Sequence, residues 1–233
     1  VVTGNKALLA THGPELFVDR DDPRRALRDA YAATADSGER HTVFVLGEPG
    51  IGKTRLVSEF AQVLHGEGAV VVAGRCDADL ELPYQPFVEA LEHLVAHADD
   101  TVLQTHLQVH GDRVARLVPA LQPGGAVTEH TGESERYLLY TAIEDLLVSA
   151  AGERPLLVVL EDLHWADVPT VRLLRRLLTS PRRGAVLFLG TPRRSRSNSS
   201  PIAAATMSVS RTSAPSRPMR CCSVSLMLTG SCA

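Results

Sequence analysis

The stretch "GEPGIGKT", residues 47–54, constrains the fold of this chain more than any other. Four of its residues fit the pattern G-x-x-x-x-G-K-[ST]: Gly47, Gly52, Lys53 and Thr54. The preceding "TVFVL" (42–46) is a short apolar run typical of a strand buried on both faces, and apolar residues at helical spacing follow the stretch. A glycine loop between a buried strand and a helix N-terminus is a structure that binds phosphate groups.

The rest of the chain continues this alternation of strand and helix. Further buried strands are predicted at "AVVVA" (69–73), "LLVVL" (156–160) and "AVLFLG" (185–190). Amphipathic patterns predict helices over 24–35, 86–98, 101–110, 135–151 and 170–178, with a loop over 118–135. Alternating strands and helices favour a parallel sheet covered on both faces. We therefore expect an α/β fold, the P-loop NTPase three-layer sandwich with a mostly parallel sheet.

The loop predicts a site for ATP with Mg²⁺. Its glycines let backbone N–H groups surround the β-phosphate, Lys53 can reach the β- and γ-phosphates, and the Thr54 hydroxyl is a ligand for Mg²⁺. An ordinary glycine-rich turn is the alternative. The residues expected to contact the nucleotide are Gly47, Glu48, Pro49, Gly50, Ile51, Gly52, Lys53, Thr54 and Arg55.

Two acids, Glu161 and Asp162, follow directly on the predicted strand "LLVVL". In a parallel sheet ligands lie outside the carboxyl ends of the strands, so the acids and the glycine loop should face one crevice. One acid could hold Mg²⁺ through water, together with Thr54, while the other polarises the attacking water. An N-cap pair for the next turn is the alternative reading.

Composition divides the chain near residue 193. Residues 1–193 carry all 27 acidic residues and 19 of the 24 Lys and Arg, a net charge of −8, whereas residues 194–233 carry five Arg and no acid. No apolar run of about 18 residues and no signal-peptide pattern occurs, so we expect a soluble, cytoplasmic protein without a membrane partner. Cysteine spacing supports neither a disulfide framework nor a zinc site.

Other polar clusters carry weaker hypotheses. His93 with His97, and His106 with His110, have a spacing that could place two imidazoles on one helix face, but packing or solvated histidines are favoured because neither pair has the Glu of H-E-x-x-H. Arg172, Arg175 and Arg176 form a basic stripe, interpreted as a solvated face or a contact with a partner. The acidic first part offers no broad footprint for nucleic acid, so no direct contact with it is expected.

Several segments together resemble the ATPase module of bacterial signal-transduction ATPases with numerous domains. They are "GEPGIGKTRLV", "GRCDADLELPYQPFVEAL", "LLVVLEDLHWADVPTVRLLRRLL" and "LFLGTPR". The similar members are large ATP-binding regulators of the LuxR type and actinobacterial multidomain proteins in which an AAA-like module is joined to a nucleotide cyclase. The resemblance covers roughly residues 15–193, and "DLHWAD" is specific to this group.

The resemblance implies roles for individual residues. Residues 47–54 become the Walker A loop, and Glu161 and Asp162 the Walker B acids, with Glu161 where Asp is usual. Arg193 matches a sensor arginine that touches the γ-phosphate and follows Pro192, where an aromatic residue is common. "LFVDR" (16–20) resembles an entry segment near the adenine pocket, which implies adenine contacts by Val18 and Arg20, with Asp19 in place of a glycine.

These features predict an ATP-binding switch module of a multidomain transcriptional regulator. Its partners would be ATP and the other domains of a full-length protein. One alternative is the control domain of a nucleotide-cyclase signalling protein, and another is a nucleotide-independent scaffold.

We expect three segments: an extension over 1–14, an incomplete AAA-like domain over 15–193, and a low-complexity tail over 194–233. The tail holds eleven Ser and no acid, which is typical of an unstructured segment or of a frameshifted reading of a GC-rich gene. AAA-like sheets place a fifth strand beside the Walker A strand. A chain disrupted near residue 193 would lack it, leave "TVFVL" as an exposed apolar edge, self-associate and hydrolyse ATP slowly at most.

Overall fold

The computed structural model describes residues 21–79, 82–121, 132–152, 154–192, 219–220 and 224–230. Four parallel strands form the centre of the sheet: β1 (His41–Gly47), β2 (Val71–Arg75), β3 (Leu156–Glu161) and β4 (Val186–Gly190). Two antiparallel strands extend it, β5 (Met219–Arg220) and β6 (Val224–Gly230), in the order β2-β3-β4-β1-β6-β5. The α/β fold with a mostly parallel sheet is therefore confirmed.

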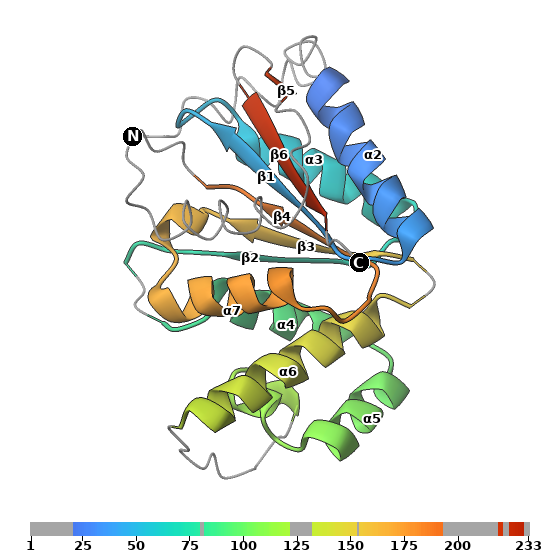
Figure 1. The fold of residues 1–233 in the computed structure, drawn as a ribbon, viewed down its shortest axis with the longest axis vertical. Coiled ribbons are helices and arrows are strands. Elements are labelled where there is room, and N and C mark those ends of the chain that lie inside the picture. Colours follow the sequence, from blue (N-terminus) through green and yellow to red (C-terminus); the bar gives the residue numbers. More distant parts are fainter. Residues whose placement is uncertain are drawn as a thin grey trace.

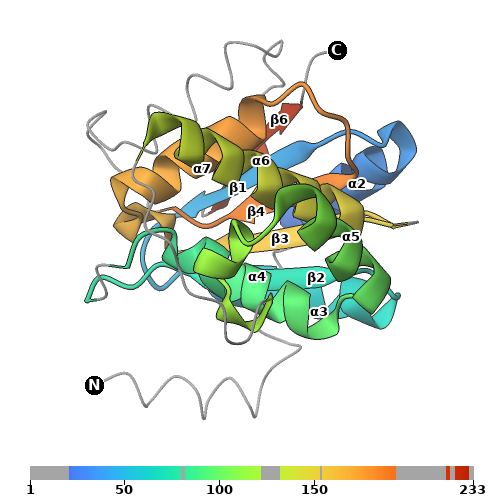
Figure 2. The same cartoon turned by 90° about the horizontal axis from the view of Figure 1, so that it is seen from below.

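Helices cover both faces of this sheet (Figures 1 and 2). On one face lie α2 (Asp21–Ser37) and α3 (Lys53–Gly66), and on the other lie α4 (Gln85–His97), α6 (Glu133–Ala150) and α7 (Val168–Thr179), with α5 (Asp100–His110) packed on α6. Three short 3-10 helices complete the described elements: η2 (Val114–Arg116), η3 (Pro119–Leu121) and η4 (Leu163–Trp165). Within the described residues, none of the helices combines the length and apolar character that crossing a bilayer requires.

The core consists of two apolar layers separated by the sheet. Phe44, Phe188 and Ile143 belong to the layer against α4, α6 and α7, while Val43 and Leu56 belong to the layer against α2 and α3. The central residues of the parallel strands are apolar because successive side chains enter opposite layers, and both layers are buried, whereas polar residues such as Arg75 and Glu161 stand at strand ends. Burying one such Leu or Phe stabilises the fold by about 2 kcal/mol.

The expectation of an unstructured tail is wrong at β5 and β6. Strand β6 pairs with β1 over its full length in antiparallel register, from His41 opposite Gly230 to Gly47 opposite Val224. The strand "TVFVL" is therefore not an exposed edge, since a strand of the tail occupies the place beside it. The run "VSLMLTG" is apolar enough to form a strand, although the tail around it is rich in Ser. Residues 193–218, 221–223 and 231–233 lie outside the described part.

Candidate functional site

The glycine loop connects the carboxyl end of β1 to the first residue of α3. Gly50 and Gly52 have φ of 79° and 87°, in the left-handed region that glycine enters without steric cost, and Gly52 is the N-cap of α3. The Lys53 ammonium donates hydrogen bonds to the carbonyl oxygens of Gly47 at 2.9 Å and Glu48 at 3.2 Å. The lysine thus folds back over its own loop, at the start of a 14-residue helix whose N-terminus favours negative charge.

The two ends of the loop region differ in their exposure. Glu48, Pro49 and Gly50 are exposed, whereas Ile51 and Gly52 are half-buried.

Arg55, expected to contact the nucleotide, forms an ion pair with Glu59 at 2.7 Å, one turn further along α3. Arg24 of α2 also pairs with Glu59, so this carboxylate joins α2 to the helix that carries the loop.

The acid pair lies at the end of β3. Glu161 is the last residue of the strand and is half-buried, and Asp162 follows with φ of 52°, a left-handed conformation that Asp tolerates better than most residues. The Asp162 N–H donates a hydrogen bond to Thr191 Oγ1 at 3.0 Å. Thr191 is buried directly after β4, and its own N–H donates to the Leu160 carbonyl at 3.0 Å.

Thr191 is a site residue that the sequence reasoning missed. It holds the strained backbone of Asp162 from the neighbouring strand, so β4 fixes the direction of the second acid. A polar residue at the carboxyl end of a strand next to the acid strand is the signal that could have found it.

Thr54 and Glu161, both expected as ligands of Mg²⁺, lie near each other across the crevice. The Thr54 hydroxyl is close enough to the Glu161 carboxyl to act on its pKa. Burial raises the pKa of Glu161, and the negative charge of Asp162 raises it further, while Arg75 and the Thr54 hydroxyl act in the opposite direction. Glu161 Oε1 is buried and has no hydrogen-bond partner among the described residues.

Arg75, the last residue of β2, also reaches the acid pair and was not predicted. Its Nε lies 3.1 Å from Asp162 Oδ2 and 3.8 Å from Glu161 Oε2. Strand β2 pairs with β3 so that Arg75 stands opposite Glu161 in the register, and the Cys76 N–H donates to the Glu161 carbonyl at 3.0 Å. The strand order brings this arginine to the acids, and strand order is not a local property of the sequence.

Gly74 fixes the position of Arg75. A Cβ on Gly74 would lie 1.8 Å from the Pro86 carbonyl oxygen, so only glycine lets β2 approach the start of α4 this closely. On the same segment, the Arg75 N–H donates to Glu89 Oε2 of α4 at 2.8 Å. The free thiol of Cys76 is buried, and burial raises its pKa to about 12, so it is not a nucleophile at neutral pH.

Three residues of the predicted site lie outside the described part of the chain: Val18, Arg20 and Arg193. The adenine contacts and the sensor arginine therefore have no structural counterpart, and these assignments stay predictions.

The two rings of each histidine pair lie against each other. His93 and His97 are exposed with ring centroids 4.7 Å apart, His106 is buried, and His110 Nε2 lies 2.8 Å from Asp145 Oδ2. Within the described residues, no three His, Cys, Asp or Glu side chains converge in a group suited to a metal ion.

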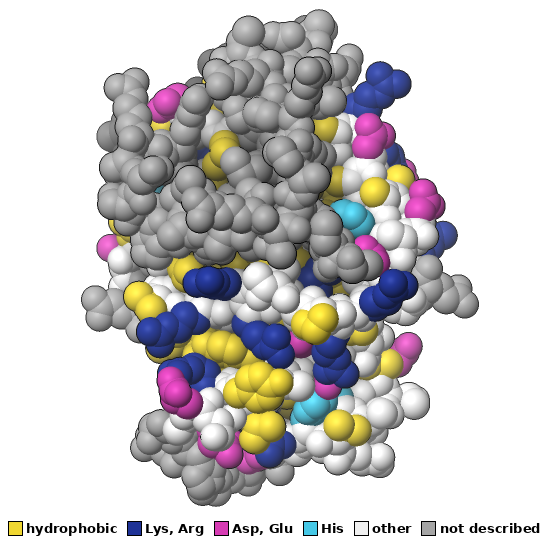
Figure 3. All heavy atoms as spheres, viewed as in Figure 1, with side chains coloured by type: hydrophobic (Ala, Val, Ile, Leu, Met, Phe, Trp, Pro, Cys, Tyr) yellow, Lys and Arg dark blue, Asp and Glu magenta, His cyan; other side chains and the backbone are white. Residues whose placement is uncertain are grey.

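The arginine stripe lies on α7 beside exposed apolar residues of α6. Arg172 and Arg175 are exposed, and the Arg176 guanidinium lies 5.2 Å from the centre of the Tyr137 ring. Figure 3 shows basic and apolar side chains mixed on the face that α6 and α7 form. This face is distant in sequence from the glycine loop, and no described carboxylate forms an ion pair with the stripe.

The described residues fit a nucleotide with Mg²⁺. Mg²⁺ is usually held by one or two carboxylates together with phosphate oxygens and water, and the crevice offers Glu161, Asp162 and the Thr54 hydroxyl. The buried Glu161 Oε1, which has no hydrogen-bond partner in the part of the chain that the structure describes, is an oxygen of the kind such a site requires. The left-handed Gly50 and Gly52 leave the loop backbone accessible to phosphate.

Comparison with known proteins gives a match to one family model, the AAA ATPase domain, over residues 16–189. A comparison with curated proteins finds no match.

Proposed function

Because the chain belongs to the AAA ATPase domain family, we propose that it binds ATP with Mg²⁺ between the glycine loop and the acid pair. The observation that carries the proposal is the nearness of Thr54 and Glu161, two oxygen-bearing side chains from separate motifs, of which the Thr54 hydroxyl acts on the pKa of the Glu161 carboxyl across the crevice. A scaffold that had lost nucleotide binding would have no need to keep a hydroxyl and a carboxylate together beside a glycine loop.

Lys53 would exchange partners when ATP binds. Its ammonium now satisfies its hydrogen bonds with the carbonyls of Gly47 and Glu48, both within the loop. Phosphate oxygens carry a full negative charge and make stronger hydrogen bonds with an ammonium than carbonyls do. The lysine would therefore turn to the β- and γ-phosphates, while loop N–H groups and the N-terminus of α3 bind the same groups.

The acid pair would divide the work of hydrolysis. Thr54, Glu161 and Asp162 would hold Mg²⁺, which neutralises phosphate charge when bound. Glu161, half-buried beside the Thr54 hydroxyl, would hold metal-bound water. Asp162, directed by Thr191 and paired with Arg75, would orient the attacking water. The side chain of Asp162 is half-buried at the rim, which gives a water molecule access to it.

The resemblance to LuxR-type ATP-binding regulators supports a switch as the biological role. ATP held between the loop and the acids would favour one arrangement of this domain against its neighbours, and hydrolysis would release it. Trp165, the single tryptophan of the chain, lies in η4 directly after the acid pair, so its fluorescence can report on events in the crevice.

Calorimetry with the full chain tests the proposal. We expect Lys53→Ala to abolish binding of ATP in the presence of Mg²⁺, because the variant loses the fixed positive charge of the loop. Arg25→Ala, which removes an exposed arginine of α2, is the matched control and should bind as the unmodified chain does. Equal affinity of the Lys53→Ala variant and the unmodified chain would refute the assignment.

A further inference from the structure

Strand β2 has an open edge. It is the terminal strand of the sheet and pairs with β3 alone among the described strands. Leu157 donates its N–H to the Val70 carbonyl and Cys76 donates to the Glu161 carbonyl, so the even-numbered residues from 70 to 76 bond to β3. The N–H and C=O groups of Val71 and Ala73 therefore point away from the sheet, and no described backbone group bonds to them.

A cavity of about 840 Å³ opens along this edge. Its floor is formed by Val70, Val71 and Val72, two of its walls come from helices on opposite faces of the sheet, and the residues at and after the end of α6 (149–152) and the start of α5 also line it. On the α3 wall lie Ala61 and His65, and on the α4 wall lie residues around Leu94. Figure 2 shows β2 beside both helices. The walls thus flank the sheet edge as they would flank one further strand, which would lie about 4.8 Å from β2.

The rim of the cavity is rich in hydrogen-bond donors. His65, His93 and His97 line it together with Arg154, against the one carboxylate of Asp99. The guanidinium of Arg154 lies beside Gly68, and its charge helps to lower the pKa of Glu67, but Glu67 forms its ion pair with Arg28. Among the described residues, two guanidinium groups therefore share one carboxylate here, and this excess of positive charge beside the outward backbone groups of β2 favours a ligand that carries both amides and a carboxylate.

We propose that this groove binds an extended peptide segment that adds to β2 as a further strand, with apolar side chains between α3 and α4 and a carboxylate at Arg154. The site is separate from the nucleotide crevice, and the inference does not depend on the proposed function. The other candidate for this edge is a second copy of the chain, which would pair its own β2 with it, and the oligomeric state distinguishes the two.

A fluorescent seven-residue peptide, blocked at both ends, with glutamate at its first and last positions and valine between them, is the probe, because the valines then face both helices and a carboxylate lies at either end. We expect it to bind the full chain, and the same peptide N-methylated at alternate backbone amides to lose binding, because it can no longer pair with the edge. Fluorescence anisotropy measures both. Failure of the glutamate peptide to bind, or equal binding of the N-methylated one, would overturn the proposal.

Two variants locate the site. Val71→Pro removes the outward N–H while the ladder with β3 stays intact, so peptide affinity should fall about tenfold or more, whereas Val71→Thr keeps the N–H and should bind normally. Arg154→Glu, at an exposed position, should weaken binding of the glutamate peptide about tenfold and strengthen binding of an analogue with lysine in place of glutamate. Unchanged affinity in folded Val71→Pro and Arg154→Glu proteins would overturn the proposal.

Sedimentation analysis over a concentration series tests the other candidate occupant of the edge, a second copy of the chain. We expect the unmodified chain and the Val71→Pro variant to sediment alike. Self-association that is lost in Val71→Pro would assign the edge to a second copy and overturn the peptide assignment.

Discussion

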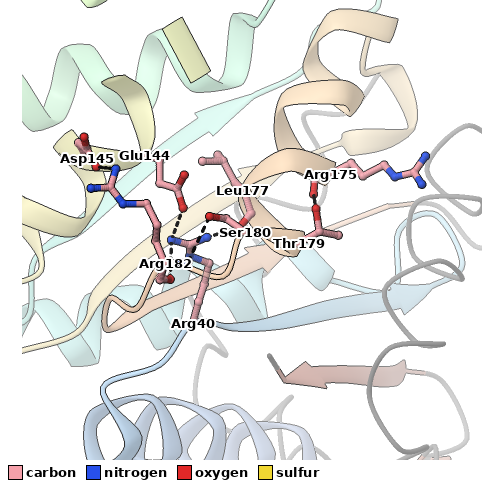
Figure 4. Close-up of polar contacts among 8 residues, drawn as sticks. All are labelled: Arg40, Glu144, Asp145, Arg175, Leu177, Thr179, Ser180 and Arg182. Carbon is pink, nitrogen blue, oxygen red and sulfur yellow. Dashed lines mark hydrogen bonds and ion pairs between the residues drawn. The ribbon is translucent and has the colours of Figure 1, made fainter. Parts of the chain in front are cut away.

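Arg40 and Glu144 form an ion pair inside the protein, with 2.9 Å between Arg40 Nη2 and Glu144 Oε1 and side chains only 5% and 1% exposed (Figure 4). Arg40 precedes β1 and also donates hydrogen bonds to the carbonyls of Leu177 and Arg182. One guanidinium therefore joins the start of the central strand to α6, to the end of α7 and to the segment before β4. Arg40 lies at the amino ends of the strands, whereas the crevice lies at their carboxyl ends.

Replacing Arg40 by Met should lower the free energy of unfolding by about 3–5 kcal/mol, because Glu144 then stays buried without a counter-charge. The double variant Arg40→Met, Glu144→Leu should recover much of this loss. Arg183→Met is the control, since it breaks an exposed pair with Glu39 at 3.6 Å and should cost less than about 1 kcal/mol. Urea denaturation measures all three. Equal losses at Arg40 and Arg183 would show that the buried pair contributes little.

Asp162→Asn should reduce ATP hydrolysis much more than ATP binding. The amide keeps the shape of the side chain and tolerates the left-handed φ of 52°, but it cannot accept a proton from water or attract Mg²⁺ by charge. A phosphate-release assay beside a titration followed by Trp165 fluorescence separates the two effects. If binding is lost while turnover per bound ATP is unchanged, the roles of Glu161 and Asp162 must be exchanged.

His106 should make stability depend on pH below neutrality. Burial, reinforced by the neighbouring His110, lowers the pKa of His106 from 6.5 to about 4, so the folded protein holds a neutral imidazole. Below pH 6.5 the His106 imidazole binds a proton in the unfolded chain but stays neutral in the folded protein. The free energy of unfolding therefore falls until the pH reaches about 4. The loss from this residue should be roughly 3 kcal/mol.

Urea denaturation at pH 7 and at pH 4.5 measures the effect. Between pH 7 and pH 4.5 the free energy of unfolding should fall more in the unmodified chain than in the His106→Leu variant, which has no imidazole to protonate at this position. His110→Leu serves for comparison, because the pKa of His110 is also lowered by its burial. An identical loss in His106→Leu and the unmodified chain would contradict the prediction.

Gly74→Ala should prevent β2 and α4 from packing, since the added Cβ would lie 1.8 Å from the Pro86 carbonyl oxygen. Both backbones would have to move apart, and Arg75 would move away from the acid pair with them. Gly66→Ala is the matched control, because a Cβ there meets no atom within 4 Å and the residue ends a helix. Thermal unfolding should show a large drop for Gly74→Ala and little change for Gly66→Ala. Equal melting temperatures would show that the contact is not tight.

Local sequence determined the four parallel strands and two parts of the crevice, the glycine loop and the acid pair. The glycine loop was predicted from eight consecutive residues because its conformation depends on the residues themselves, on glycine at left-handed φ and on a lysine at the helix start. The four central strands were predicted as continuous apolar runs, and each is found within about two residues of its expected bounds. The acid pair could be predicted because it stands at the end of such an apolar run.

The tertiary structure alone decided which of these elements are neighbours. Arg75 reaches Asp162 because β2 pairs with β3, Thr191 holds Asp162 because β4 lies on the other side of β3, and Arg40 meets Glu144 across 104 residues of sequence. The place of β6 beside β1 is likewise a matter of strand order. Strand order and register result from hydrogen bonding and burial summed over the whole sheet, so segments with similar local patterns can pair in several ways, and only the packed fold selects one.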